Sequence, residues 1–291
     1  MIAHTQTSAA HDTRSVTFLF PTQATCAFEI QSCGSYHPHC SSIQSICAVP
    51  DFHGYRLYTG SRDSCVNVFR AGSREVQGSV RHVASLQGHV DWVNDVVALD
   101  MCGEGLIGTC SSDRTCRVWK ADGELQACLA GHRDYVTGLA RGGDKNEFGG
   151  RDPHMWSCGL GGEVFGWDVE VGKRCVSFDG LDLGQSAYCV ASMGGCVEGL
   201  GGCVCVGTAG RGKNVVVLDG RSEEIVCGLM GHGGTVRKVV VGGDGVVYTA
   251  GGDGLIKGWD MRYVREFGGH HALHTIRCHS TCWFFDRCWW I

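Results

Sequence analysis

The sequence predicts an all-β fold made of repeated four-stranded sheets. Apolar runs of strand length are bounded by Gly and Asp, as in residues 92–99, 106–109 and 116–119, and Gly and Asp favour turns. No segment keeps the apolar period of a helix. The same markers also recur along the chain, which indicates an internal repeat.

Two kinds of marker define the repeat. Gly-His pairs stand at residues 88–89, 131–132, 231–232 and 269–270. The second marker is an aromatic or apolar residue late in each unit: Phe69, Trp119, Trp167, Leu218 and Trp259. A single four-stranded sheet cannot bury both of its faces, so units of this size stack on their neighbours.

Between the markers, His, Thr, Asp and Trp stand at positions where their side chains can form a chain of hydrogen bonds. We expect two complete structural tetrads: His89, Thr109, Asp113 and Trp119, and His232, Thr249, Asp253 and Trp259. The first repeat has Phe69 in place of Trp, the third has Gly161 in place of Asp, and the fourth is the most eroded. Each such bond contributes about 0.5–1.5 kcal/mol and fixes the loop that it joins.

The Gly-His and Trp-Asp markers, at intervals of 41–51 residues, resemble those of the WD-repeat propeller family. The resemblance implies a WD-repeat β-propeller with about five recognisable four-stranded blades, incomplete or truncated relative to the family. The expected organisation is a leader at 1–33, a propeller at 34–267 with blades at about 34–82, 83–125, 126–179, 180–225 and 226–267, and a tail at 268–291.

Both ends of the propeller carry further expectations. A strand at residues 16–20 would pair with the last blade and close the ring. Residues 264–267 would form the outer strand of the fifth blade, and a sixth repeat would begin at His270 before running into a Cys- and Trp-rich tail.

Composition and charge exclude several classes of function. The formal net charge is −5, so there is no overall electrostatic attraction to nucleic acid, and none is expected as a partner. No apolar run approaches the length of a membrane span, and no secretory signal pattern opens the chain. We therefore expect a cytoplasmic or nuclear protein, with most of its 19 cysteines reduced and buried.

Motifs typical of cofactor, metal or catalytic sites are weak. Residues 103–108 fit G-x-G-x-x-G and residues 207–214 nearly fit a phosphate loop, but strand-like segments follow both where a helix is required. The tail could supply zinc ligands from His270, His271, His274, Cys278, His279, Cys282 and Cys288. A zinc- or thiol-dependent enzyme is therefore one alternative, although no enzyme, cofactor or metal is the favoured prediction.

Side chains beside the structural His residues are the candidate partner-binding residues. In a propeller of this family the Gly-His loops and the repeat Asp loops lie on one face. The predicted contacts are Asp91, Trp92, Asn94, Asp134, Tyr135 and Arg237. Aromatic residues beside charges are typical of protein-binding hot spots. The alternative for Trp92 is local packing between blades.

The segments 88–97, 132–136, 186–190 and 218–221 are similar, in the same order, to the WD-repeat family that activates ubiquitin-specific proteases. That resemblance implies a non-catalytic protein that binds the fingers region of a deubiquitinase and raises its activity allosterically. It also places Arg237 where the family uses a basic residue toward the protease. The alternative is a generic WD-repeat adaptor, such as a ubiquitin-ligase substrate receptor or a signalling scaffold.

Overall fold

The fold is all-β, as predicted. The computed structural model describes residues 5–6, 15–17, 27–28, 38–51, 54–72, 80–99, 105–143, 153–179, 186–194, 200–209, 213–263 and 272–277. In this part of the chain no helix is long and apolar enough to span a membrane.

Five antiparallel four-stranded sheets follow one another, and each joins four consecutive strands. Their strands are β4 (Ile43–Asp51), β5 (Gly54–Ser61), β6 (Cys65–Gly72) and β7 (Val80–Gln87) in blade 1; β8 (Val93–Leu99), β9 (Leu106–Ser111), β10 (Thr115–Trp119) and β11 (Leu125–Ala130) in blade 2; β12 (Val136–Arg141), β13 (Met155–Gly159), β14 (Val164–Asp168) and β15 (Lys173–Phe178) in blade 3; β16 (Ala187–Ser192), β17 (Cys203–Thr208), β18 (Lys213–Asp219) and β19 (Glu224–Met230) in blade 4; and β20 (Val236–Val241), β21 (Val246–Gly251), β22 (Leu255–Asp260) and β23 (His274–Arg277) in blade 5.

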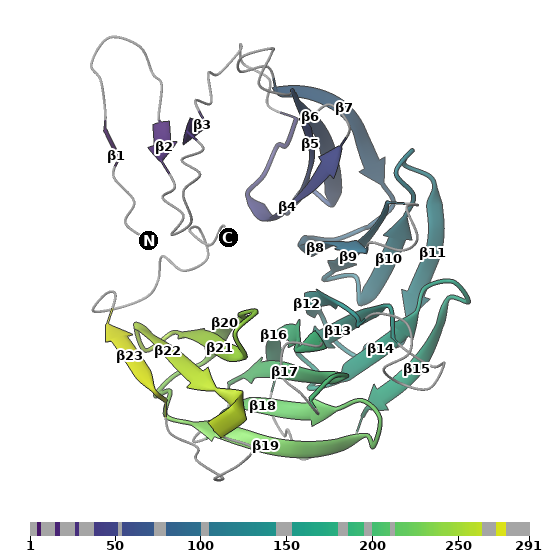
Figure 1. The fold of residues 1–291 in the computed structure, drawn as a ribbon. Coiled ribbons are helices and arrows are strands. Elements are labelled where there is room, and N and C mark those ends of the chain that lie inside the picture. Colours follow the sequence, from purple (N-terminus) through teal and green to yellow (C-terminus); the bar gives the residue numbers. More distant parts are fainter. Residues whose placement is uncertain are drawn as a thin grey trace.

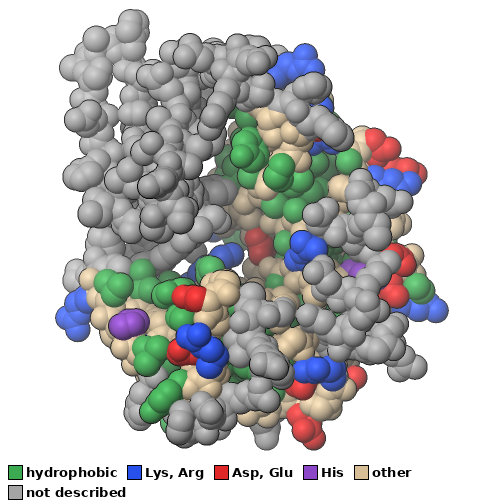
Figure 2. Space-filling view, in the orientation of Figure 1, with side chains coloured by type: hydrophobic (Ala, Val, Ile, Leu, Met, Phe, Trp, Pro, Cys, Tyr) green, Lys and Arg blue, Asp and Glu red, His purple; other side chains and the backbone are tan. Residues whose placement is uncertain are grey.

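The five sheets are the blades of a β-propeller, arranged as an arc around a common axis (Figure 1). The first strands β4, β8, β12, β16 and β20 lie next to one another in sequence order on the inner side of the arc. The described residues do not close this arc into a complete ring. Basic and acidic side chains are interspersed along its outer edge (Figure 2).

The hydrophobic core is divided among the interfaces between blades. One buried cluster joins blades 1 and 2, a second joins blades 2 and 3, and two more join the later pairs. Trp119, Trp167 and Trp259 each lie in the cluster that their blade shares with the preceding one. The recurring Trp therefore serves contact between repeats, which explains why a repeat cannot be stable alone.

The blades end later than the sequence analysis placed them. The fourth strand of blades 1, 2 and 4 runs to the residue just before a Gly-His pair, at Gln87, Ala130 and Met230. The predicted limits at 82, 125 and 225 are therefore a few residues short. The outer strand pairs along its full length and stops only where the positive φ of Gly131 or Gly231 turns the chain.

Two predictions about the ends of the propeller were wrong. Blade 5 takes its fourth strand from β23 (His274–Arg277), and the predicted strand at 264–267 lies outside the described residues. Val16 belongs to β2 (Ser15–Thr17), which pairs with β1 (Thr5–Gln6) and β3 (Ala27–Phe28) in a separate three-stranded sheet. Because β23 occupies the outer edge of β22, that edge is not available to the leader.

Asp95, on the inner strand β8, connects three blades. One carboxylate oxygen accepts a hydrogen bond from Ser45 Oγ of blade 1 at 2.7 Å. The other accepts the backbone N–H of Leu139 in blade 3 at 3.0 Å. The negative charge of Asp95 also raises the pKa of Lys238 in blade 5. A single carboxylate thus holds neighbouring inner strands in register around the axis.

We expect Asp95→Ala to lower the free energy of unfolding by about 2–4 kcal/mol, because it removes a charged acceptor and leaves Leu139 N–H unpaired. Ser45→Ala, which removes only one of these bonds, is the matched control and should cost about 1 kcal/mol. Urea unfolding followed by tryptophan fluorescence measures both. Equal losses for the two variants would contradict the proposed role of Asp95.

Candidate functional site

The upper face is defined here as the end of the propeller that carries the Gly-His turns and the hairpins between second and third strands. In blade 2 the tetrad is closed. His89 Nδ1 lies 2.8 Å from Asp113 Oδ2 and Nε2 lies 2.9 Å from Thr109 Oγ1. Trp119 Nε1 donates to the same Thr109 oxygen at 2.9 Å.

Blade 5 repeats this arrangement. His232 lies 3.0 Å from Asp253 and 2.8 Å from Thr249, and Trp259 donates to Thr249 at 2.9 Å. An indole N–H can only donate and a carboxylate can only accept, so Trp259 donates to Thr249 and Asp253 accepts the Nδ1–H of His232. The Thr249 hydroxyl also lies 3.5 Å from the Lys257 carbonyl, to which it donates. Burial lowers the pKa of His232.

Blade 1 holds a partial tetrad. His39 contacts Asp63 at 2.8 Å and Thr59 at 2.7 Å. Phe69, at the Trp position, has no N–H to donate and instead packs edge-on against His82, with 5.5 Å between ring centroids. The loop is therefore fixed by two of the three side-chain bonds.

Blade 3 places a glutamate near the position of the missing Asp, where it accepts the backbone N–H of Arg133 but forms no hydrogen bond with the His132 ring. His132 Nε2 and Trp167 Nε1 both lie 2.7 Å from Ser157 Oγ, which stands where other blades have Thr. On the other side of the ring, the buried carboxylate of Glu163 lies 3.7 Å from His132 Nδ1 and 3.2 Å from Arg133 Nε. Glu163 therefore approaches the imidazole from two residues farther along the chain than the Asp of other blades.

The absence of a side chain at Gly161 is what admits this glutamate. A Cβ built at Gly161 would overlap the Glu163 carboxylate. The sequence analysis treated Gly161 only as a loss, and it missed both Glu163 and Ser157. The sequence did contain a signal for this glutamate. Gly161 of blade 3 corresponds to Asp113 of blade 2, and Glu163 corresponds to Thr115.

Blade 4 has lost the tetrad and is held in another way. Thr208 remains and is buried, Leu218 is fully buried among apolar groups, and Gly212 lies outside the described residues. Asn214 Nδ2 donates to the Gly234 carbonyl of blade 5 at 2.9 Å. This hydrogen bond between blades 4 and 5 helps to hold the loop that the tetrad bonds hold in other blades.

Trp92 is the most prominent of the predicted partner-binding residues. Its side chain is 45% exposed, and the guanidinium of Arg62, from blade 1, lies 4.3 Å from the centroid of its ring. Asp91 accepts the backbone N–H of Trp92 at 2.7 Å and holds the turn. Trp92 thus combines the two predicted roles: it packs between blades 1 and 2, and it remains accessible to a partner.

Asn94 is occupied within the fold. Its amide donates to the Val136 carbonyl of blade 3 at 2.7 Å and to Ser112 Oγ at 3.1 Å. Thr137, the corresponding residue of blade 3, donates in the same way to the Ala187 carbonyl of blade 4 at 2.8 Å. The position after the first residue of an inner strand thus joins neighbouring blades, so Asn94 is a structural residue rather than an outward contact.

The remaining predicted contacts lie at the surface of the upper face. Asp134 is exposed and accepts the backbone N–H of Tyr135, whose ring is 47% exposed. Arg237 is exposed, and its guanidinium lies 4.8 Å from the ring centroid of Tyr188 in blade 4. Arg62 and Tyr188 were missed by the sequence analysis because each acts by stacking on a residue of a different blade.

Exposed charges on the upper face are mainly basic. Arg62, Arg114, Arg133 and Arg237 are exposed there, together with the acidic Asp134 and with Asp179, which pairs with Arg133. Asp63, Asp113 and Asp253 are largely enclosed in the tetrads. This face is therefore basic and aromatic, although the protein as a whole has a formal net charge of −5.

The tetrad carboxylates make the fold sensitive to acid. Burial alone would raise the pKa of Asp113, but hydrogen bonds from His89 and Thr115 lower it well below its usual range. Near pH 4 the unfolded chain then binds more protons than the folded protein, so stability is present above that pH and is lost as the pH falls.

We expect Asp113→Asn to flatten the loss of stability between pH 5 and pH 3 by about 1 kcal/mol. Urea unfolding at each pH measures this slope. Asp134→Asn, which removes an exposed carboxylate of the neighbouring blade, is the control and should keep the wild-type slope. An unchanged slope in Asp113→Asn would show that this tetrad does not determine the acid sensitivity.

The replacement of Asp by Glu163 predicts strong coupling between positions 161 and 163. Gly161→Asp alone should destabilise the protein by about 2 kcal/mol through overlap with Glu163. Glu163→Thr alone should cost about 1 kcal/mol, because the backbone N–H and guanidinium of Arg133 lose their acceptor. The double variant restores the pattern of blade 2 and should be more stable than either single variant. Strictly additive losses in urea unfolding would contradict the assignment.

Comparison with protein families agrees with this geometry. The family model for the WD domain, G-beta repeat, matches residues 30–70 and 80–120. The two matched segments contain the His, Thr and Asp of blade 1 and the complete tetrad of blade 2. In the described ranges, no three His, Cys, Asp or Glu side chains are grouped to hold a metal, and twelve cysteines are free thiols. Of the seven zinc candidates, His274 lies in β23, and the other six lie outside those ranges: His270, His271, Cys278, His279, Cys282 and Cys288. Blades 1 and 2 are thus WD repeats, a module that generally mediates protein–protein interaction without catalysis.

Proposed function

We propose that this protein is a non-catalytic WD-repeat scaffold that binds a ubiquitin-specific protease through its upper face and activates or positions it. The observation that carries the proposal is the segment from Asp91 to Asp95. Its sequence is similar to that of the protease-activating family, and the fold holds its aromatic residue rigid at the surface. We expect this function in the cytoplasm or nucleus.

The upper face has the composition and rigidity that favour a binding hot spot. Trp92 is stacked against Arg62 and its turn is fixed by Asp91, so little conformational entropy remains to be lost on binding. Arg237 is likewise supported by Tyr188. Aromatic and arginine side chains that are held in place before binding are the most frequent sources of interface affinity.

The charge of this face defines the complementary surface of the partner. Because its exposed side chains are mainly arginines and aromatic rings, the partner surface should present carboxylates around an apolar centre. Asn94 is excluded from the interface, since its amide is bonded between blades 2 and 3. The contacts that remain are Asp91, Trp92, Asp134, Tyr135 and Arg237.

A generic adaptor function is the second candidate. It is supported by the WD-domain match, which is common to many interaction scaffolds. Affinity capture that returns other proteins and no protease would favour it. Cys116 and Cys189 do not suit a thiol-dependent enzyme. Burial raises the pKa of each thiol to about 12, so both stay protonated and are poor nucleophiles.

We expect Trp92→Ala to weaken binding to the catalytic domain of a ubiquitin-specific protease by at least about 2 kcal/mol, or roughly thirtyfold. Biolayer interferometry measures the affinity, and cleavage of a fluorogenic ubiquitin substrate measures the stimulation. The ring fills the centre of the proposed interface, so both signals should fall together.

Tyr263→Ala provides the control for this experiment. Tyr263 is 54% exposed and follows β22 at the opposite end of the propeller, so its removal should leave affinity and stimulation unchanged. If the unaltered protein neither binds nor stimulates any ubiquitin-specific protease tested, the proposed function is wrong. Equal effects of both substitutions would place the interface elsewhere.

A further inference from the structure

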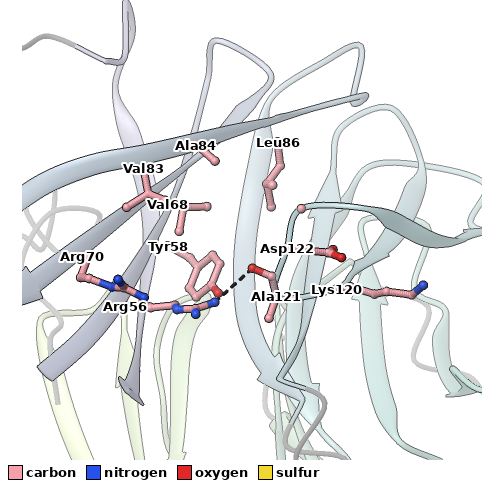
Figure 3. Close-up of a pocket in the computed structure, with 11 residues that line it drawn as sticks. Arg56, Tyr58, Val68, Arg70, Val83, Ala84, Leu86, Lys120, Ala121 and Asp122 are labelled. Carbon is pink, nitrogen blue, oxygen red and sulfur yellow. Dashed lines mark hydrogen bonds between the residues drawn. The ribbon is translucent and has the colours of Figure 1, made fainter. Parts of the chain in front are cut away.

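A second candidate site lies between blades 1 and 2, at the lower face, the end of the propeller opposite the Gly-His turns. It is a pocket of about 180 Å³ between β5, β6 and β7 on one side and the turn from β10 to β11 on the other (Figure 3). The proposed protease-binding face is at the other end of the blades.

The inner part of the pocket is apolar. Tyr58, Val68 and Leu86 are buried and form its floor, and Ala84 and the half-exposed Val83 continue the apolar wall to the surface. Binding sites for whole cofactors or drug-sized ligands usually have volumes of about 300–1,000 Å³. A volume of about 180 Å³ is suited to a single apolar side chain.

Two guanidinium groups stand at the rim and share one carboxylate. Arg56 Nε and Arg70 Nη2 lie 3.1 Å and 3.0 Å from the same oxygen, Asp51 Oδ2. Arg56 is further fixed by donating to the Ala121 carbonyl of blade 2 at 3.1 Å. Two positive groups against one negative group leave an excess positive charge at this rim. Arg70 is 43% exposed and has five N–H donors, so it can bind a second carboxylate.

The other charged residues of the pocket do not cancel this excess at the same place. Lys120 pairs with Glu124 at 2.7 Å. In Figure 3 the Lys120 ammonium and the Asp122 carboxylate both point away from Arg56 and Arg70. The guanidinium side of the rim and the apolar floor are thus adjacent, and a ligand that touches both must carry an apolar group beside an anionic one.

We propose that this pocket binds an acidic peptide segment of a partner protein, with one Leu-sized side chain inserted between blades 1 and 2 and a neighbouring carboxylate bound to Arg70. The complementarity of charge and the size of the pocket select this occupant. The site is separate from the upper face, so one partner could be held at each end of the propeller.

A labelled peptide, acetyl-Ser-Glu-Asp-Leu-Glu-Ser-amide, tests the proposal by fluorescence polarisation with the protein of residues 1–291. Saturable binding is expected. Replacing the Leu of the peptide by Ala, or its acidic residues by their amides, should weaken binding at least tenfold. Raising the salt concentration should weaken it further, because the rim contact is between charges.

Protein variants locate the binding. Arg70→Gln should weaken binding at least tenfold, and Ala84→Phe, which fills the pocket, should abolish it. Arg262→Gln, which changes an exposed arginine of blade 5, is the matched control and should bind as wild type. Thermal unfolding verifies that each variant is folded. Arg70→Gln is the variant least expected to unfold, because Arg70 is partly exposed. Lack of saturable binding at millimolar peptide, or full binding by Arg70→Gln, would overturn the proposal.

Discussion

The hydrogen bonds that run from one inner strand to the next are the constraint on which the rest of this structure depends. Each blade is a small sheet with one face packed against each neighbour, so a blade is stable only when its neighbours are in register. Asp95 fixes that register for blades 1, 2 and 3 by accepting bonds from Ser45 and Leu139. Asn94 and Thr137 extend the same pattern toward blade 4. The surface loops at both ends of the propeller are positioned by these bonds.

The tetrads act within this frame and serve both the loops and the stacking of blades. In blades 2 and 5 the chain from Trp to Asp is complete, and each Trp also packs against the preceding blade. The variation among blades follows a physical rule. Where the Asp is lost, a carboxylate from Glu163 or a bond between blades from Asn214 takes over part of its work. A repeat can therefore lose its sequence markers and still keep the four-stranded fold.

The sequence was sufficient for features that depend on contacts within one blade. The all-β class, the number of blades and the partners of His89 and His232 follow from regular spacing, because strand pairing turns a fixed separation in sequence into a fixed separation in space. Features that depend on two blades could not be predicted in the same way. The occupied amide of Asn94, the stacking of Arg62 on Trp92 and the pocket beside Arg70 all arise from residues of different repeats. The last outer strand, β23, begins farther along the chain after its inner neighbour than the outer strands of the other blades do, so its position does not follow from the repeat spacing.

The two ends of the propeller have different chemistry. The upper face presents rigid aromatic residues supported by arginines, whereas the lower pocket is narrow, apolar and edged by guanidinium groups. A scaffold of this kind needs no catalytic residue, because its effect comes from the geometry in which it holds its partners.

The most direct test of this account is hydrogen–deuterium exchange of the protein with and without a bound ubiquitin-specific protease. The account predicts slower exchange in the loops at residues 89–93, 132–135 and 235–238 of the upper face, with the lower face unchanged. Protection confined to the lower face, or no protection in the presence of saturating protease, would contradict it.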